Sequence, residues 1–252
     1  SPIGEAPFSI ALVRFYASEI IDALVYIHQQ GVVHRDLKPD NVLIMRSGHV
    51  KLADFGAALV MEMEDRRDPD AARATEEGMG SFVGTAAYVS PEVLKNRVAQ
   101  IGPPVDLWAL GVLLYEMAAG EAPFGGATEY LIFQAISDHC KGDQPIKYPP
   151  SVHPEVANLV GRLLHKDPQL RPGAHEVKQG CPSLKSHSLF EGLDWNRVGN
   201  LVPPSMPPLI QFDDTSMQTD FSNTSMGIFD SPATSDLGSP FLARGGSAGV
   251  EF

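Results

Sequence analysis

One stretch of the sequence is apolar on nearly every face of a helix. It runs from Val105 to Met117 and directly follows Pro103-Pro104. A helix of this kind is buried on all sides, and this run is too short to span a bilayer. We therefore predict a core helix. Asp106 lies inside the run, so its carboxylate must find hydrogen-bond partners within the protein.

Helical spacing and turn residues predict the other elements. A helix is expected before Gly31, a suitable C-cap, because apolar residues recur at helical spacing at Leu12, Val13, Tyr16, Ile20, Leu24 and Ile27. Two short strands are expected at 41–44 and 49–53, separated by the turn residues Arg46-Ser47-Gly48. Further helices are expected at 127–138, 154–164 and 173–179. The predicted chain is mainly α-helical, with one short β-hairpin.

The composition fits a globular protein. Of the 252 residues, 43% are hydrophobic, which is enough for one sizeable core. The opening Ser1 to Gly4 lacks the features of a secretory signal, and no apolar run is long enough to cross a membrane. Cys140 and Cys181 are interpreted as two free thiols in a reducing compartment, so we expect a cytoplasmic protein.

The net charge of −12 is concentrated in two segments. Residues 61–77 contribute −4 and residues 201–252 contribute −5. The acidity therefore gives no support to binding of nucleic acid or of a membrane surface. Residues 201–252 are also rich in Ser, Thr, Pro and Gly without any period, so we predict a disordered tail after a folded domain of residues 1–200.

The strongest functional signal is a pair of motifs. The run His34-Arg35-Asp36-Leu37-Lys38-Pro39-Asp40-Asn41 is followed, thirteen residues after its Asn, by Asp54-Phe55-Gly56. A solvated charged loop before an ordinary hairpin is the simple alternative. Eight specified residues and a second motif between a helix and a hairpin disfavour it, because a motif counts only with its context. The pair points to phosphoryl transfer from ATP.

Each residue type suits that chemistry. The transferred group passes through a loose transition state that must be aimed and charge-neutralised. Asp36 can accept the proton of an incoming hydroxyl, and Lys38 places a positive charge near the migrating phosphate. Asn41 and Asp54 supply hard oxygen ligands for Mg²⁺. Gly56 allows the backbone to turn sharply behind Asp54.

Together with further segments, these motifs resemble the C-terminal lobe of a serine/threonine protein kinase of the AGC group, in particular the phosphoinositide-dependent subfamily. The matching segments are Arg14-Phe15-Tyr16, Ser81 to Glu92, Glu129 to Gln134, and Leu184 to His187 continuing to Asp194-Trp195. The resemblance covers about residues 8–198 and implies a protein kinase-like α+β fold, of which this chain contains the mainly helical lobe. It also implies ATP and Mg²⁺ as cofactors and protein Ser/Thr hydroxyls as substrates.

The resemblance assigns roles to further residues of the ATP site and its surroundings. Lys38 followed by Pro39 is the serine/threonine form of the loop, and Thr85 sits where such kinases hydrogen-bond the catalytic Asp and Lys. Asp40 and Leu43 match positions of the ATP site, where Leu43 forms the floor beneath the adenine. His34 and Phe55 match the lower members of the apolar column that links the two lobes.

Three further roles implied by the resemblance are structural. Glu92 and Arg171 match the ion pair that anchors the activation segment to the lobe. Asp106 matches the carboxylate that accepts backbone N–H bonds from the catalytic loop.

The resemblance makes Ser81 the expected activating phosphosite. A phosphate there adds charge and acceptors, and Arg35 is the expected partner. The family places a lysine where this chain has Leu59. The hypothesis is that phosphorylated Ser81 is held mainly by Arg35 and by a basic residue outside this chain.

The N-terminal lobe is expected to be missing from the chain. No Gly-rich phosphate loop, strand lysine or helix glutamate precedes His34. The chain alone is expected to have negligible activity and to expose the apolar surface that faces that lobe. The tail is too short and polar for a phosphoinositide-binding domain, so no membrane-binding domain is expected in it.

Two functions remain open. The first is an active kinase, with activation segments of other AGC kinases as the substrates implied by the resemblance, or a general basophilic Ser/Thr kinase. The second is a truncated, inactive lobe that acts as an interaction module.

Overall fold

The computed structural model describes residues 8–61, 85–95 and 101–204. The predicted phosphosite Ser81 and residues 205–252 of the predicted tail lie outside the described residues. The chain divides into two units, Ser1–Leu209 and Ile210–Phe252, and the second lies wholly outside the described residues.

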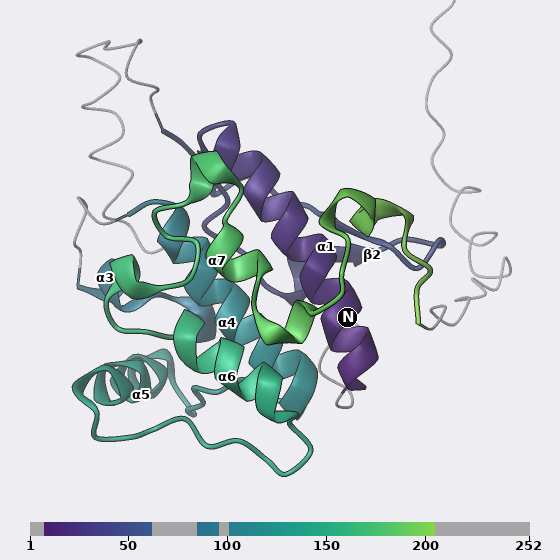
Figure 1. Ribbon diagram of the computed structural model, residues 1–252. Helices are drawn as coiled ribbons and strands as arrows, with labels where there is room; N and C mark the ends of the chain where they lie inside the picture. Colours follow the sequence, from purple (N-terminus) through teal and green to yellow (C-terminus); the bar gives the residue numbers. More distant parts are fainter. Residues whose placement is uncertain (1–7, 62–84, 96–100, 205–252) are drawn as a thin grey trace, which may run out of the picture. The chain divides into compact units, whose positions relative to one another are not determined.

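The described chain is mostly helical, as predicted, and it contains two small sheets where one hairpin was expected (Figure 1). The α-helices are α1 Ile10–Gln29, α3 Pro91–Leu94, α4 Pro103–Ala119, α5 Glu129–Lys141, α6 Pro154–Leu163 and α7 Pro182–Lys185. The strands are β1 Val32–Val33, β2 Val42–Ile44, β3 Val50–Leu52 and β4 Leu59–Val60. Short 3-10 helices connect them: η1 Pro39–Asn41, η2 Ala86–Tyr88, η4 Pro168–Leu170, η5 Val177–Gln179, η6 Ser188–Phe190 and η7 Trp195–Asn200.

Helix α4 is the predicted core helix. All but three of its seventeen residues are buried, and Pro103 and Pro104 occupy its first turn, where the missing N–H groups cost nothing. Gly120 ends it with a φ of 83°, a conformation that glycine adopts without a steric penalty. Helices α1 and α6 both pack against α4. The apolar run therefore becomes the centre of one core because neighbours cover it on several sides.

Helix α1 begins and ends where local chemistry predicts. The Ser9 side chain accepts a hydrogen bond from the Leu12 N–H and caps the first turn. The helix closes at Gln30, and Gly31 follows in the left-handed region with a φ of 76°. Its amphipathic face is buried against α4, so the helix delivers the following loop to the centre of the domain.

The predicted hairpin is present, and a second sheet was not predicted. Strands β2 and β3 are antiparallel, with Val42 opposite Leu52 and Ile44 opposite Val50. Strands β1 and β4 pair Val32 with Val60 and Val33 with Leu59. Two-residue strands are too short to show a period, and their partners are far apart in the sequence, so no local pattern could reveal them.

The helix predicted at 173–179 is wrong. This segment forms turns and only the short 3-10 helix η5. Gly173 has a φ of 89°, which is incompatible with a right-handed helix, and a Cβ there would lie 3.2 Å from the Cys181 Cβ. The apolar spacing in this segment serves burial against the core instead.

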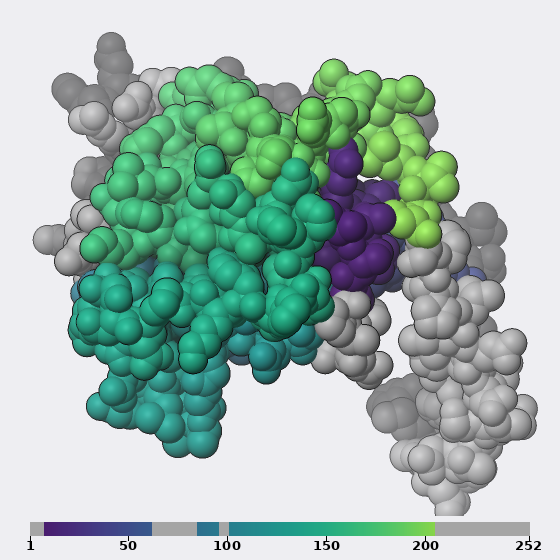
Figure 2. Space-filling model, turned by 60° about the horizontal axis from the view of Figure 1, so that its bottom comes forward, coloured from purple at the N-terminus to yellow at the C-terminus, as the bar shows by residue number. Residues whose placement is uncertain are grey.

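The end of the described chain returns to its beginning. Helix η7 packs on α1, and Figure 2 shows the yellow-green end of the described chain beside purple α1. The Trp195 indole N–H donates to the Lys185 carbonyl at 3.0 Å, and the Lys185 ammonium lies 4.9 Å from the Trp195 ring centroid. Among the described helices, none is both long enough and apolar enough to cross a membrane.

Candidate active site

Asp106, on α4, holds the loop that carries Asp36. The two carboxylate oxygens of Asp106 accept hydrogen bonds from the backbone N–H groups of His34 and Arg35, each at 2.8 Å. His28 Nε2, at the end of α1, donates to the same carboxylate at 2.7 Å. Asp106 is fully buried, so these bonds are the partners that the sequence required of it. The backbone bonds that the resemblance implied are present.

Arg35 adopts an uncommon backbone conformation for a residue with a side chain. Its φ is 64°, a left-handed geometry that costs a non-glycine residue roughly 1 kcal/mol or more. The bond from its N–H to Asp106 stabilises this geometry, and its Nε donates to the Ala57 carbonyl at 2.6 Å. Burial lowers the pKa of the Arg35 guanidinium, while the nearby Asp106 carboxylate opposes that shift.

The sharp turn after His34 gathers Asp36, Lys38 and Asn41. Lys38 Nζ lies 2.8 Å from Asp36 Oδ2. Asn41 donates from Nδ2 to the same oxygen at 3.0 Å and to the Asp36 carbonyl at 2.7 Å. Both side chains of the Lys38–Asp36 pair are mostly buried, at 20% and 11% exposed, so the Asp36 carboxylate is fixed in one orientation. The side-chain Nδ2 of Asn41 donates both of these bonds, so its side-chain Oδ1 is the atom that could bind a cation.

The hairpin brings Asn41 and Asp54 to the same end. Strand β2 begins immediately after Asn41, and β3 ends two residues before Asp54. The Ala53 N–H donates to the Asn41 carbonyl at 2.9 Å, which continues the ladder beyond the strands. Asp54 has a φ of 61° and accepts the Gly56 N–H at 3.1 Å. This tight turn exposes the Asp54 carboxylate.

The donor set fits magnesium. Mg²⁺ prefers carboxylate and amide oxygens and is commonly held by one or two protein ligands together with phosphate oxygens. Asp54 and Asn41 supply one oxygen type each. No group of three or more His, Cys, Asp or Glu residues within the described ranges could hold a metal by itself.

Two apolar side chains next to these residues, Phe55 and Leu43, face solvent. Phe55 is 46% exposed, and its ring centroid lies 4.9 Å from that of the buried His34. Leu43, on β2, is 48% exposed. Apolar surface at Leu43 and Phe55 is therefore open to solvent beside the loop that carries Asp36.

Two predicted site residues are not drawn into this cluster. Thr85 is exposed, and within the described part of the chain its side chain makes no hydrogen bond to Asp36 or Lys38. Asp40 is exposed on η1. The Tyr88 hydroxyl donates a hydrogen bond to Glu116. Burial of Tyr88 raises its pKa well above the usual range, and the bond to Glu116 and the charge of Asp40 act in the same direction.

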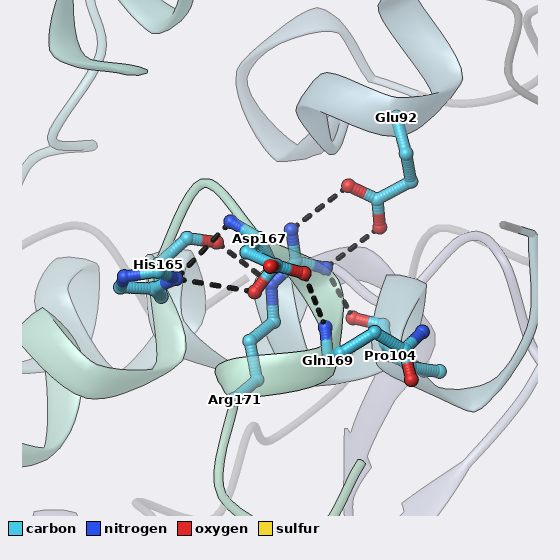
Figure 3. A network of polar contacts seen from close by, with 6 residues as sticks. All are labelled: Glu92, Pro104, His165, Asp167, Gln169 and Arg171. Atoms are coloured by element: carbon cyan, nitrogen blue, oxygen red, sulfur yellow. Dashed lines mark hydrogen bonds and ion pairs between the residues drawn. The ribbon is translucent and has the colours of Figure 1, made fainter. Parts of the chain in front are cut away.

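The predicted ion pair between Glu92 and Arg171 is present and buried. Arg171 donates from two nitrogens to the two Glu92 oxygens at 2.7 and 2.8 Å, and both side chains are at most 1% exposed. Figure 3 shows that the same guanidinium also reaches the carbonyls of Pro104 and His165, at 2.7 and 3.0 Å. It stacks over Trp108, 5.1 Å from the ring centroid. One side chain thus ties α3 to the start of α4 and to the loop before η4.

Sequence reasoning missed two members of this support. His28 was not singled out, although a histidine on the buried face of a helix next to the loop was a usable signal. The pairing of β1 with β4, which brackets the loop and Asp54, had no local signal because its two strands are separated by the whole loop and hairpin.

Comparison with known proteins identifies the family of this chain. The protein kinase domain family matches residues 4–180. The chain therefore belongs to the protein kinase domain family.

Several relatives narrow the resemblance. A 3-phosphoinositide-dependent protein kinase 1 of Arabidopsis thaliana is 44% identical over 198 residues, which cover 77% of this chain and 38% of the relative. The human protein of that name is 39% identical over 219 residues, covering 86% of this chain and 36% of the relative. A cAMP-dependent protein kinase catalytic subunit-like protein of Caenorhabditis elegans is 38% identical over 222 residues, 87% of this chain and 50% of the relative. The predicted resemblance to AGC kinases of the phosphoinositide-dependent type is confirmed. The chain spans less than two fifths of the first two relatives.

Proposed function

We propose that this chain is the C-terminal lobe of a serine/threonine protein kinase that transfers the γ-phosphate of ATP to protein hydroxyls. The observation that carries the proposal is the cluster of Asp36, Lys38 and Asn41, with Asp54 at the same end of the hairpin as Asn41. In this arrangement a base, a positive charge and two oxygen ligands converge, which is what aiming and neutralising a transferred phosphoryl group requires.

The proposed roles follow from these contacts. Asp36 orients the substrate hydroxyl and accepts its proton. Lys38, which contacts Asp36, stabilises charge on the migrating phosphate. Asn41 and Asp54 would hold Mg²⁺ through their side-chain oxygens, and Asp40 and Leu43 would contribute to the nucleotide site. Bound Mg²⁺ supplies charge neutralisation on the phosphate oxygens.

The test is Asp36→Ala in the full-length protein, assayed with radiolabelled ATP, Mg²⁺ and a serine peptide. The expected result is loss of turnover with an unchanged thermal unfolding midpoint, because Asp36 lies on a loop that Asp106 holds through the backbone. Asp138→Ala is the matched control, since Asp138 pairs with exposed Lys141 on α5. Activity in Asp36→Ala equal to that of the control would contradict the role of Asp36 as base.

The proposed substrates are serine or threonine residues in the activation segments of other AGC kinases. Similarity to 3-phosphoinositide-dependent protein kinases supports this choice. A peptide array with the full-length protein tests it: preference for activation-segment peptides supports the proposal, and equal phosphorylation of any peptide with nearby basic residues supports a general basophilic kinase.

Ser81 is the proposed activating phosphosite, with Arg35 as its partner. The described contact of the Arg35 side chain uses Nε, so its terminal nitrogens have no hydrogen bond within the described ranges. Leu59, at the position where the resemblance implies a lysine, is buried in a small apolar cluster with Val33, Ile101 and Val105, so this position serves packing here. Unchanged activity in Ser81→Ala would contradict the proposal.

A further inference from the structure

We propose that Glu19, on α1, is a positioning residue that sets the place of the metal-binding end of the β2–β3 hairpin. This inference rests on the proposed function, because it concerns the residues assigned there to Mg²⁺. Figure 1 shows the hairpin on the α1 side of the domain, and its strand β3 packs against α1, so a side chain of this helix can reach the hairpin directly.

Glu19 forms hydrogen bonds with two successive residues of the hairpin, His49 and Val50. Its Oε2 accepts the Val50 N–H at 2.8 Å, and its Oε1 hydrogen-bonds to His49 Nδ1. The Glu19 side chain is only 7% exposed, so the charge is buried in this contact. The His49 ring also lies against Phe15 of α1, with centroids 5.7 Å apart. A buried carboxylate with a partner on each oxygen has one favourable position.

The Val50 N–H needs this acceptor. Val50 lies opposite Ile44 in the register, while the neighbouring bond of the ladder runs from the Met45 N–H to the His49 carbonyl. The Val50 N–H therefore belongs to the outer edge of a two-stranded sheet. A partly buried donor without a partner is unfavourable, because it loses its bond to water and gains none within the protein. Glu19 removes that cost only when the hairpin sits at one place on α1.

The position of the hairpin decides the position of the proposed metal ligands. Asn41 and Asp54 flank its open end, and Glu19 holds its turn end. The loop that carries Asp36 is held separately, by Asp106 on α4. Two buried carboxylates on two helices thus fix the two halves of the site. Loss of the Glu19 contact lets β3, which leads to Asp54, shift relative to Asp36 and Asn41, because Asn41 is bonded to Asp36 and Asp106 keeps their loop in place.

The test measures metal affinity, because a purely structural role of Glu19 would not change the affinity of the remaining folded protein. Mn²⁺ is titrated into the full-length protein with a non-hydrolysable ATP analogue and followed by electron paramagnetic resonance. Since one such hydrogen bond contributes on the order of 1 kcal/mol, Glu19→Ala is expected to weaken Mn²⁺ binding about fivefold. Glu19→Gln keeps an acceptor for the Val50 N–H and is expected to restore most of the affinity.

Asp22→Ala is the matched control. Asp22 is an acid on the same helix that pairs with Lys185 instead of the hairpin, so its removal is expected to leave Mn²⁺ affinity unchanged. The inference is overturned if Glu19→Ala binds Mn²⁺ as tightly as Asp22→Ala, or if Glu19→Gln is as weak as Glu19→Ala. The binding assay does not depend on turnover. An inactive wild-type protein would therefore count against the proposed kinase function, whereas the Mn²⁺ affinities of the variants would still test the role of Glu19.

Discussion

At the scale of single residues, a few buried polar side chains hold several parts of the chain each. Asp106 accepts bonds from His28, near the C-terminal end of α1, and from the loop, and Arg171 joins three segments. Burying such groups is unfavourable unless every polar atom has a partner. The hydrogen bonds of these buried side chains therefore fix their positions. Where such a side chain can gain or lose a proton, the free energy of unfolding is expected to change with pH.

His187 is such a side chain. Its Nε2 lies 2.9 Å from Asn158 Oδ1, and its Nδ1 accepts the Leu189 N–H at 3.1 Å, an arrangement that requires the neutral ring. Burial, and then the charge of Arg162, lowers the pKa of His187. Below the ordinary histidine pKa of about 6.5 the unfolded chain binds a proton that the folded protein rejects.

The free energy of unfolding is therefore expected to fall as the pH drops below about 6.5, and this part of the pH dependence is expected to disappear in His187→Gln. Urea unfolding at about pH 7.5 and 5.5 measures it. His175→Gln is the control, because His175 is exposed. Equal pH dependence in wild type and His187→Gln would count against this role of His187.

At the scale of elements, close approach of helices matters as much as their apolar faces. A Cβ at Gly111, on α4, would lie 2.9 Å from the Leu163 Cβ and 2.9 Å from Leu164 Cδ2. The packing of α4 against α6 therefore requires glycine at this position. Gly161, on α6, is a useful contrast, because the nearest atom to its added Cβ is the Tyr148 hydroxyl oxygen at 3.6 Å.

Gly111→Ala is expected to lower the free energy of unfolding by about 1–2 kcal/mol, since overpacking costs more than the helix propensity of alanine returns. Gly161→Ala is expected to raise it by about 0.5–1 kcal/mol, because the added methyl group fits and the unfolded chain loses freedom. Urea titration of both variants gives the comparison. The close-packing argument fails if the two substitutions change stability in the same direction.

At the scale of the whole molecule, contacts between distant parts of the sequence hold the described chain together. Glu92 and Arg171 are 79 positions apart, and Lys185 and Asp22 are 163 apart. The first pair is buried and bidentate, whereas the second is partly exposed. Buried and exposed ion pairs differ in their effect because water screens and solvates the exposed one.

Arg171→Ala is expected to destabilise the protein by about 3–5 kcal/mol, because it leaves Glu92 buried without a partner. Arg171→Lys keeps the charge but not the two parallel bonds and is expected to lie between that variant and wild type. Lys141→Ala, which removes an exposed ion pair on α5, is the control and is expected to leave the stability nearly unchanged, because water screens this pair. Thermal unfolding followed by circular dichroism measures all three. Similar losses for Arg171→Ala and Lys141→Ala would contradict the anchoring role.

The sequence by itself determined the helix α4, the β2–β3 hairpin and the two motifs that hold Asp36, Asn41 and Asp54. These features are local: an apolar run, a turn between two strands and fixed spacings are visible within a few residues. The 173–179 segment shows the limit, because apolar spacing predicted a helix that the backbone of Gly173 and its packing against Cys181 prevent.

Only the tertiary structure decided how these parts meet. It selected His28 as a partner of Asp106, paired β1 with β4, and placed Glu19 against the turn end of the hairpin. Each of these contacts joins residues that are far apart in the chain, and each satisfies a polar group that folding buries. Local spacing carries no information about such partners, because the need for them arises only when the core closes around α4.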